Sequence, residues 1–295
     1  MKSVMLIVNP NSGKSKPKSM LFDIIQTLSD ARCIVTTRIT SAQGDAIEFA
    51  RSACNSRLYD LIVCCGGDGT LSETISGILT SENNIPVGYI PCGSTNDYAR
   101  SLNISSDHIK AATVAAKGEE YPVDIGVING RYFNYIASFG LFTSVSYNAS
   151  RSLKSMLGHT AYVLEGTKEL TKIKANHVKI ETESGVYEDD YIFGAIANST
   201  SIGGIVKLSE TLVSFNDGVF EIYLVKMPKN PADIVKIVRG IMNSDFTEDC
   251  FEFFRASSLK ISAPDDMPWS LDGEKAEPGS DIKVDILHSA VKLMM

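Results

Sequence analysis

The sequence predicts two domains of different fold class, α/β plus all-β: an N-terminal doubly wound nucleotide-binding domain and a C-terminal β-sandwich. Three observations support this prediction. The chain has 295 residues, which exceeds the usual size of a single hydrophobic core. Strand-like and helix-like patterns alternate up to about residue 120, and short β-rich runs dominate from there on. A glycine-rich loop follows one of the strands expected in the first domain.

In the first domain, four apolar or β-branched runs predict the strands of a parallel sheet: 4–8, 34–39, 61–65 and 87–90. Helices are expected between them, where apolar residues recur at helical spacing or a helix-starting residue stands: from Pro17, over 43–54, over 71–79 and from about Asn96. An open parallel sheet binds its ligand beyond the carboxyl ends of its strands. The conspicuous loops of this chain all leave the sheet at that edge.

After Asp124 the pattern becomes that of antiparallel hairpins. Asn129-Gly130 separates two β-rich runs, and these residue types supply the positive φ angles of a two-residue turn. Further strands are expected over 178–182, 191–197, 219–225, 259–262 and 282–287, with helical segments near 153–171 and 231–241. We therefore assign residues 1–123, which 290–295 can complete, to the α/β domain, and residues 124–289 to the β-sandwich.

Composition and charge limit the partners and the compartment. The formal net charge of −7 argues against a nucleic-acid partner bound through a broad basic surface. No run of about 18 apolar residues is present and the apolar start is too short for a signal peptide, so we expect a cytoplasmic protein with at most peripheral membrane association. Six cysteines without a C-x-x-C pair should be reduced, and four histidines without metal-ligand spacing predict neither zinc nor a catalytic histidine.

The loop Gly66-Gly67-Asp68-Gly69-Thr70 has the composition of a nucleotide-phosphate loop. Its glycines let the backbone turn tightly and approach an anion, and the N-terminus of the following helix favours negative charge. Asp68 would repel a phosphate unless a metal ion or another cation lies between them, so its presence indicates chemistry rather than passive binding. The alternative is a tight turn in which Asp68 caps the helix.

Two further loops belong with this one. Residues 9–14 (Asn-Pro-Asn-Ser-Gly-Lys) leave the first strand, and residues 93–97 (Gly-Ser-Thr-Asn-Asp) leave the fourth. The first loop is not a Walker A motif, because Val8 stands where that motif requires glycine. The glycine-rich loop is not a dinucleotide fingerprint, because Ser72 holds its third glycine position, and this disfavours a dehydrogenase.

Together these motifs resemble the diacylglycerol kinase catalytic family, and especially its soluble bacterial lipid kinases. The resemblance spans the whole chain and rests on Asn9-Pro10 with Ser12-Gly13-Lys14, Gly66–Thr70, Pro91 with Gly93 and Asn96-Asp97, Asp217-Gly218, and Asp272-Gly273-Glu274. It implies a fold like that of NAD kinases and diacylglycerol kinases, with ATP bound in the cleft between the two domains. The implied activity is transfer of the γ-phosphoryl group of ATP to a lipid hydroxyl, with diacylglycerol as the expected acceptor and phosphatidic acid as the product.

The resemblance also implies roles for individual residues. The residues that it assigns to ATP are Asn9, Pro10, Asn11, Ser12, Gly13, Lys14, Thr40, Gly66, Gly67, Asp68, Gly69, Thr70, Leu71, Ser72, Ser94, Asn96 and Asp97. Among these, Lys14, Asp68 and Asp97 would form a charged network that holds Mg²⁺ and the phosphates. Asp272 and Glu274 would supply the catalytic base. A further, structural Mg²⁺ would use the Asp217 side chain and the carbonyls of Ser214 and Val219.

Local reasoning bears on the last two sites. Asp272 and Glu274 lie two residues apart, which would place both side chains on one face of an extended strand. The alternative is a surface Asp-Gly turn, and the same alternative applies to Asp217-Gly218. Between Lys207 and Asp217 the usual Pro and Ala of the family are replaced, which concerns the structural metal rather than catalysis.

Two alternative functions share parts of this pattern. NAD kinases have the Gly-Gly-Asp-Gly-Thr loop, although the other loops fit lipid kinases better, and a non-catalytic lipid-binding or regulatory protein is a different class. The expected partner is a lipid substrate at a membrane surface, where basic residues such as Arg151 and Lys154 could help docking. A homodimer is left open. The acceptor itself is not identified, because acyl-chain pockets are built from generic apolar residues.

Overall fold

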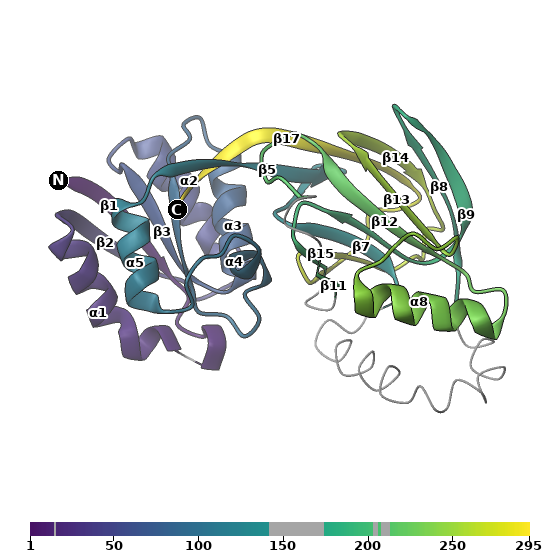
Figure 1. Ribbon diagram of the computed structural model, residues 1–295. Helices are drawn as coiled ribbons and strands as arrows, with labels where there is room; N and C mark the ends of the chain where they lie inside the picture. The colour runs from purple at the N-terminus through teal and green to yellow at the C-terminus, as the bar shows by residue number, and fades with distance from the viewer. Residues whose placement is uncertain (15, 142–173, 203–205, 208–212) are drawn as a thin grey trace. The chain divides into compact units, whose positions relative to one another are not determined.

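The computed structural model describes residues 1–14, 16–141, 174–202, 206–207 and 213–295. The helical segment expected near 153–171 and the basic residues Arg151 and Lys154 lie outside these ranges. The chain divides into two compact units, here called unit 1 (Met1–Ile125 with His288–Met295) and unit 2 (Gly126–Leu287) (Figure 1). None of the helices in the described ranges has the length and apolar character needed to cross a membrane.

Unit 1 is built on a parallel sheet, as the alternation of the sequence predicts. Its strands are β1 (Lys2–Val8), β2 (Cys33–Ile39), β3 (Leu61–Gly66) and β4 (Val87–Pro91), in the order β4-β3-β1-β2. The end of β17 (Asp281–Met294) is added beside β4, where Leu293 pairs with Val87. The winding of the chain reverses between β1 and β3, and such a switch point is where open α/β sheets bind ligands.

Helices cover both faces of this sheet. Figure 1 shows α1 (Lys16–Asp30) and α5 (His108–Lys117) side by side on the near face. The other helices of unit 1 are α2 (Asp45–Ser56), α3 (Asp68–Leu79), the five-residue α4 (Asp97–Ser101) and the 3₁₀ turn η1 (Ser12–Lys14). The backbones of α2 and α3 approach closely, because a Cβ atom on Gly77 would lie 2.3 Å from the Ile47 carbonyl oxygen.

The neighbouring Cys64 and Cys65 point to opposite faces of the sheet, as expected for a strand. Cys65 belongs to the core formed with α1 and α5, whereas the Cys64 thiol lies against Thr74 of α3. None of the six cysteines forms a disulfide bond, and five of them are buried. The sequence did not indicate α5, because its buried face consists of alanines rather than of large apolar residues.

Unit 2 is antiparallel. Its strands are β6 (Arg131–Phe133), β7 (Ile136–Gly140), β8 (Asn176–Thr182), β9 (Gly185–Ala197), β12 (Phe220–Lys226), β13 (Phe251–Ala256), β14 (Ser258–Ser262), β15 (Trp269–Leu271), β16 (Glu274–Ala276), the short pair β10 (Ser201–Ile202) and β11 (Val206–Lys207), and the adjoining ends of β5 (Glu120–Ile128) and β17. The first half of β9 pairs with β8, and its second half lies between β7 and β12. One strand therefore contributes to both layers of the sandwich.

Aromatic side chains fill the core of unit 2. The rings of Phe139 and Trp269 are fully buried, with their centroids 5.0 Å apart. Phe139 lies directly over Gly194 of β9, where a Cβ atom would come within 2.2 Å of the ring. Gly194 therefore allows the ring to pack flat on the neighbouring strand.

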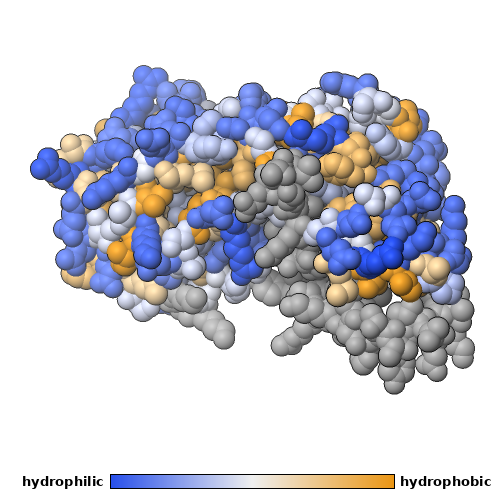
Figure 2. Space-filling model, in the orientation of Figure 1, coloured by the Kyte–Doolittle hydropathy of each residue, from blue (hydrophilic) through white to orange (hydrophobic). Residues whose placement is uncertain are grey.

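The helix α8 (Pro231–Asn243) confirms the helical segment expected near 231–241. Asn230 caps it in a capping box with Asp233, and Pro231 stands in its first turn. Large apolar side chains reach the surface singly on this helix, namely Val235 and Met242. Figure 2 accordingly shows hydrophobic residues between hydrophilic ones in the part of the surface where Figure 1 draws α8.

Candidate functional site

Three loops meet at the carboxyl edge of the sheet in unit 1. They follow β1 (residues 9–14), β3 (residues 66–72) and β4 (residues 92–97). Backbone hydrogen bonds join them, because Asn9 N–H donates to the Cys65 carbonyl (2.9 Å) and Cys92 N–H donates to the Gly66 carbonyl (2.7 Å). The structure thus brings together the three loops that the sequence singled out.

The glycines of these loops pack backbone against backbone. Gly13 has a φ of +49°, and a Cβ atom there would lie 2.0 Å from the Cys92 carbonyl oxygen. A Cβ atom on Gly93 would lie 2.8 Å from the Cα atom of Gly67. No larger residue fits at these positions without moving a loop, so the close approach itself requires glycine.

Polar side chains fix the loops relative to one another. Asn9 Nδ2 donates to Thr70 Oγ1 (3.0 Å), and the Gly67 N–H donates to Ser12 Oγ (3.2 Å). Asn96 closes the third loop, because its Oδ1 accepts from the Gly93 N–H (2.8 Å). These bonds pre-organise a glycine-lined surface at the N-terminus of α3, which is the arrangement that binds phosphate in many nucleotide sites.

Asp68 does not cap its own helix. The N-cap of α3 is Gly67, without a side-chain cap bond, which excludes the alternative expected from turn chemistry. The Asp68 carboxylate instead accepts from the backbone N–H of Asp97 at the start of α4 (3.2 Å), and the Tyr89 hydroxyl lies 3.5 Å from its other oxygen. Burial and the nearby Asp97 raise the pKa of Asp68 to about 6.

Asp97 completes a pair of carboxylates. Its side chain is 7% exposed, and its Oδ1 atom is buried without a hydrogen-bond partner among the described residues. Burial raises the pKa of Asp97, and Arg100, 3.7 Å away, opposes this rise. Two carboxylates with unused acceptor capacity beside a phosphate-type loop fit a hard cation such as Mg²⁺, which binds through one or two carboxylates together with phosphate oxygens.

Not every residue assigned to the nucleotide is equally placed for it. Leu71 is fully buried, and its N–H donates within α3 to the Gly67 carbonyl, so it belongs to the core. Thr40 is buried at the end of β2, with its hydroxyl 3.4 Å from the Val8 carbonyl. Ser94 is exposed in the third loop. The side chain of Lys14 lies outside the described part of the chain.

Two buried thiols pack against each other next to the second and third loops. Cys65 and Cys92, each directly before a glycine of the site, have their Sγ atoms 3.4 Å apart. Their hydrogen bond and burial both raise the pKa of Cys65 far above its ordinary value. A thiol held in the neutral form is a poor nucleophile, so this pair serves packing rather than chemistry.

The expectation for Asp272 and Glu274 requires correction. They do not share a face of one extended strand, because Asp272-Gly273 forms the turn of the hairpin between β15 and β16. The φ angles of +49° at Asp272 and +87° at Gly273 are those of a two-residue turn. The alternative of an Asp-Gly turn is confirmed, but its expected place at the surface is wrong for Asp272, which is buried.

The turn is buried rather than superficial at Asp272. Its carboxylate accepts from three successive backbone N–H groups, those of Asn134 (2.7 Å), Tyr135 (3.1 Å) and Ile136 (3.2 Å). These bonds lie at the break between β6, which ends at Phe133, and β7, which begins at Ile136. Glu274, in contrast, is exposed. The two carboxylates therefore occupy very different surroundings.

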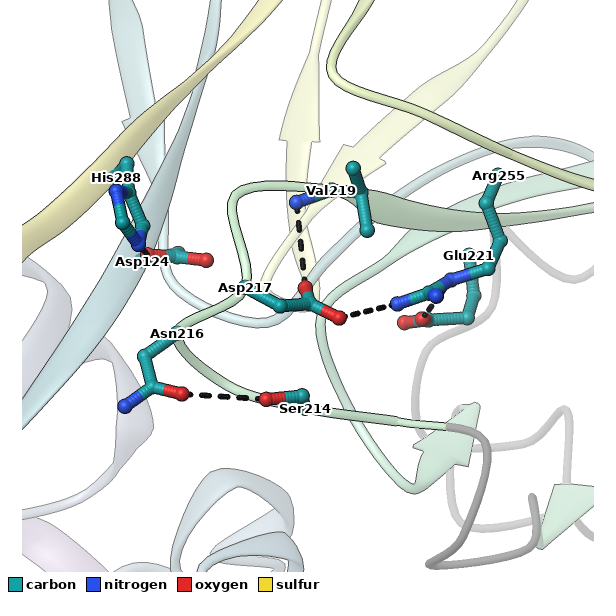
Figure 3. A network of polar contacts seen from close by, with 8 residues as sticks. All are labelled: Asp124, Ser214, Asn216, Asp217, Val219, Glu221, Arg255 and His288. Atoms are coloured by element: carbon teal, nitrogen blue, oxygen red, sulfur yellow. Dashed lines mark hydrogen bonds and ion pairs between the residues drawn. The ribbon is translucent and has the colours of Figure 1, made fainter.

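The residues expected to hold a structural metal ion have other partners (Figure 3). Asp217 forms an ion pair with Arg255, and its Oδ1 accepts from the Val219 N–H (3.3 Å). Arg255 also pairs with the fully buried Glu221, with 3.1 Å between Nε and Oε1. Burial raises the pKa of Glu221 to about 7, and the positive charge of Arg255 opposes this rise. Asp217, the only side chain in the predicted metal site, does not fit a cation here, because the Arg255 guanidinium already pairs with its carboxylate.

Arg255 and Asp124 were not indicated by the sequence. Arg255 could have been found as a charge on a β-rich run beside another run that carries Glu221. Asp124 is fully buried in unit 1 and accepts from the Ser289 N–H (2.6 Å), with His288 beside it at 4.0 Å. Only the folded pairing of β5 with β17 identifies this contact.

Comparison with known proteins identifies the family. Residues 3–128 match the diacylglycerol kinase catalytic domain, and residues 136–295 match the YegS C-terminal NAD kinase beta sandwich-like domain. A diacylglycerol kinase of Bacillus subtilis (strain 168) is 34% identical over 276 residues, which cover 93% of this chain and 90% of the relative. The chain belongs to the diacylglycerol kinase family.

Other members of the diacylglycerol kinase family agree with this assignment. A diacylglycerol kinase of Staphylococcus epidermidis is 34% identical over 274 residues, covering 92% of this chain and 86% of that protein. A crystal structure from Bacillus anthracis str. Sterne matches with a TM-score of 0.80 at 27% identity, covering 99% of this chain and 97% of that one. The predicted fold class is confirmed, and family membership supports a lipid kinase enzyme.

Gly93→Ala should destabilise unit 1 because the added Cβ atom would lie 2.6 Å from Asn96 Oδ1 and 2.8 Å from Gly67 Cα. We expect a loss of about 1–3 kcal/mol in the free energy of unfolding, measured by urea denaturation. Gly185→Ala is the matched control, because a Cβ atom there meets nothing within 4 Å. Equal losses in both variants would show that the loop contact does not limit this position.

Asp68→Asn should stabilise the protein at neutral pH in buffer without nucleotide or metal. The pKa of Asp68 is raised to about 6, so the folded protein favours the protonated form of this side chain. The stability that protonated Asp68 provides is complete below pH 3.8 and is lost as the pH rises through 6, where the buried side chain ionises. The uncharged variant should be more stable at pH 7.5 by about 1–3 kcal/mol, and this gain should shrink toward pH 5. Asp107→Asn should show no such gain, because hydrogen bonding to Lys110 lowers the pKa of Asp107. Thermal unfolding across pH tests both.

Proposed function

We propose that this member of the diacylglycerol kinase family transfers the γ-phosphoryl group of ATP to a lipid hydroxyl, with diacylglycerol as the acceptor and phosphatidic acid as the product. The observation that supports this function is that three loops pack closely through their glycines beside the carboxylates of Asp68 and Asp97. ATP, Mg²⁺ and the lipid are part of the proposal. The family supports a lipid kinase, and the relatives named diacylglycerol kinase supply the acceptor to be tested first.

The chemistry asked of this site is mainly electrostatic. Phosphoryl transfer needs donor and acceptor in line and the charge on the phosphates neutralised. The loop backbones of unit 1 would orient the phosphates, and Asp68 and Asp97 would hold the Mg²⁺ that neutralises them. The buried Asp97 Oδ1 has no hydrogen-bond partner in the described part of the chain, which supports this role, because such an atom gains most from a bound cation.

We assign the base to Glu274 and a positioning role to Asp272. Three backbone N–H groups bind the Asp272 carboxylate and hold it in place. Glu274 is two residues away on the same hairpin, exposed, and able to approach an acceptor hydroxyl. The anchored turn would aim Glu274, as a positioning residue does for a general base.

The acceptor defines where the enzyme would work. Diacylglycerol resides in membranes, so we propose action at a membrane surface without a spanning segment. A higher rate on vesicle-embedded acceptor than on monomeric short-chain acceptor, at equal concentration, is the expected result.

The proposal is tested by incubating the purified protein with γ-labelled ATP, Mg²⁺ and vesicles that contain diacylglycerol. Labelled phosphatidic acid is the expected product, and mass spectrometry of a lipid extract would identify other acceptors. Parallel reactions with NAD in place of lipid distinguish the NAD kinase alternative. Transfer to NAD alone, or to neither substrate, would contradict the lipid kinase.

Glu274→Gln should lower kcat by about 10²–10⁴-fold with little change in the affinity for ATP or in the melting temperature, because only the proton acceptor is lost. Asp272→Asn should lower both kcat and stability, because its amide would face backbone donors with a donor of its own. Steady-state kinetics, ATP titration and thermal unfolding separate the two effects. A large kcat loss confined to Asp272→Asn, at unchanged stability, would exchange the two roles.

A further inference from the structure

We propose that Arg255 replaces a structural metal ion in unit 2, and that its guanidinium fixes the turn around Asp217 to the sheet. The turn comprises residues 214–219, which directly precede β12. Figure 3 shows Arg255 between the Asp217 and Glu221 side chains. The inference concerns the architecture of unit 2 and does not depend on the proposed kinase reaction.

A cation such as Mg²⁺ would need Asp217 as its only charged ligand in the expected set, with the carbonyls of Ser214 and Val219. Both Asp217 oxygens are already used, one by Arg255 and the other by the Val219 N–H (3.3 Å). In the described ranges no group of three His, Cys, Asp or Glu side chains is arranged to hold a metal ion. A divalent ion beside a guanidinium would also meet strong like-charge repulsion.

The sheet fixes Arg255 independently of the turn. Arg255 on β13 stands directly opposite Glu221 on β12 in the antiparallel register. Glu221 is fully buried, and loss of the cation next to it would leave an uncompensated buried carboxylate, which is strongly unfavourable. The Nε atom of Arg255 serves Glu221, and its Nη2 atom remains available for Asp217. One planar guanidinium can bind two carboxylates in this way, which lysine cannot do with the same geometry.

The turn gains a fixed anchor from this arrangement. Gly218 supplies a φ of +75°, which reverses the chain before β12. Asp217 then faces Arg255 across a short distance, and the Ser214 hydroxyl bonds Asn216 (3.2 Å) within the same turn. Because the positive charge belongs to the Arg255 side chain, it binds the turn at any metal concentration. Stability of the turn should therefore follow Arg255 and not Mg²⁺.

The experiment compares thermal unfolding and hydrogen exchange of nucleotide-free protein in EDTA and in excess Mg²⁺. Arg255→Met should lower the melting temperature by about 5–10 °C in both buffers and speed exchange at residues 214–219. Arg239→Met is the matched control, because Arg239 pairs with Glu248 on the surface of the same unit. It should shift the melting temperature by less than about 2 °C and leave exchange of the turn unchanged.

Asp217→Asn provides a second variant in which the Arg255–Glu221 pair stays intact. It should speed exchange of the turn, and the difference between EDTA and Mg²⁺ should be the same as in the wild type. A stabilisation by Mg²⁺ that is present in the wild type and absent in Asp217→Asn would overturn the proposal. Wild-type exchange in Arg255→Met would overturn it as well.

Discussion

The contact on which the site depends is the packing of three loop backbones at the switch point of the unit 1 sheet. Gly13 lies so close to the Cys92 carbonyl, and Gly93 so close to Gly67, that side chains are excluded at Gly13 and Gly93. The parallel order β4-β3-β1-β2 brings the loop ends together, and the helices packed on both faces hold the strands in place. A rigid, glycine-lined surface of this kind can bind phosphates with little reorganisation.

Carboxylates acquire different roles in this protein through their surroundings. Asp272 is bound by three backbone N–H groups and acts as an anchor, whereas Glu274 on the same hairpin is exposed. Burial raises the pKa values of both Asp68 and Asp97, and the nearby Asp97 raises that of Asp68 further. Asp217 and Glu221 both form ion pairs with Arg255. Solvation and partners, rather than residue type, decide the chemistry.

Family membership and local geometry answer different questions. The match over both domains assigns the fold and the enzyme class, and relatives about one third identical share that assignment. At the Asp217 turn, an ion pair with Arg255 is found where the resemblance implied a metal ion. Where the chain replaces residues between Lys207 and Asp217, an arginine on a neighbouring strand meets the carboxylate. If Arg255 takes the place of a metal ion, as we propose, the fold is kept and the turn depends on a side chain instead.

The sequence alone determined the fold class, the β-strands and helices with strong periodicity, the Asn129-Gly130 hairpin and the gathering of three loops, because these follow from local patterns and from the direction of parallel strands. It missed the alanine-rich α5 and misjudged the shared face of Asp272 and Glu274. Only the tertiary structure decided which carboxylates bind backbone N–H groups, which form ion pairs, and which have a buried oxygen without a hydrogen-bond partner among the described residues. Those outcomes depend on burial and on partners more than a hundred residues away, as with Asp272 and Asn134, and no local pattern encodes them.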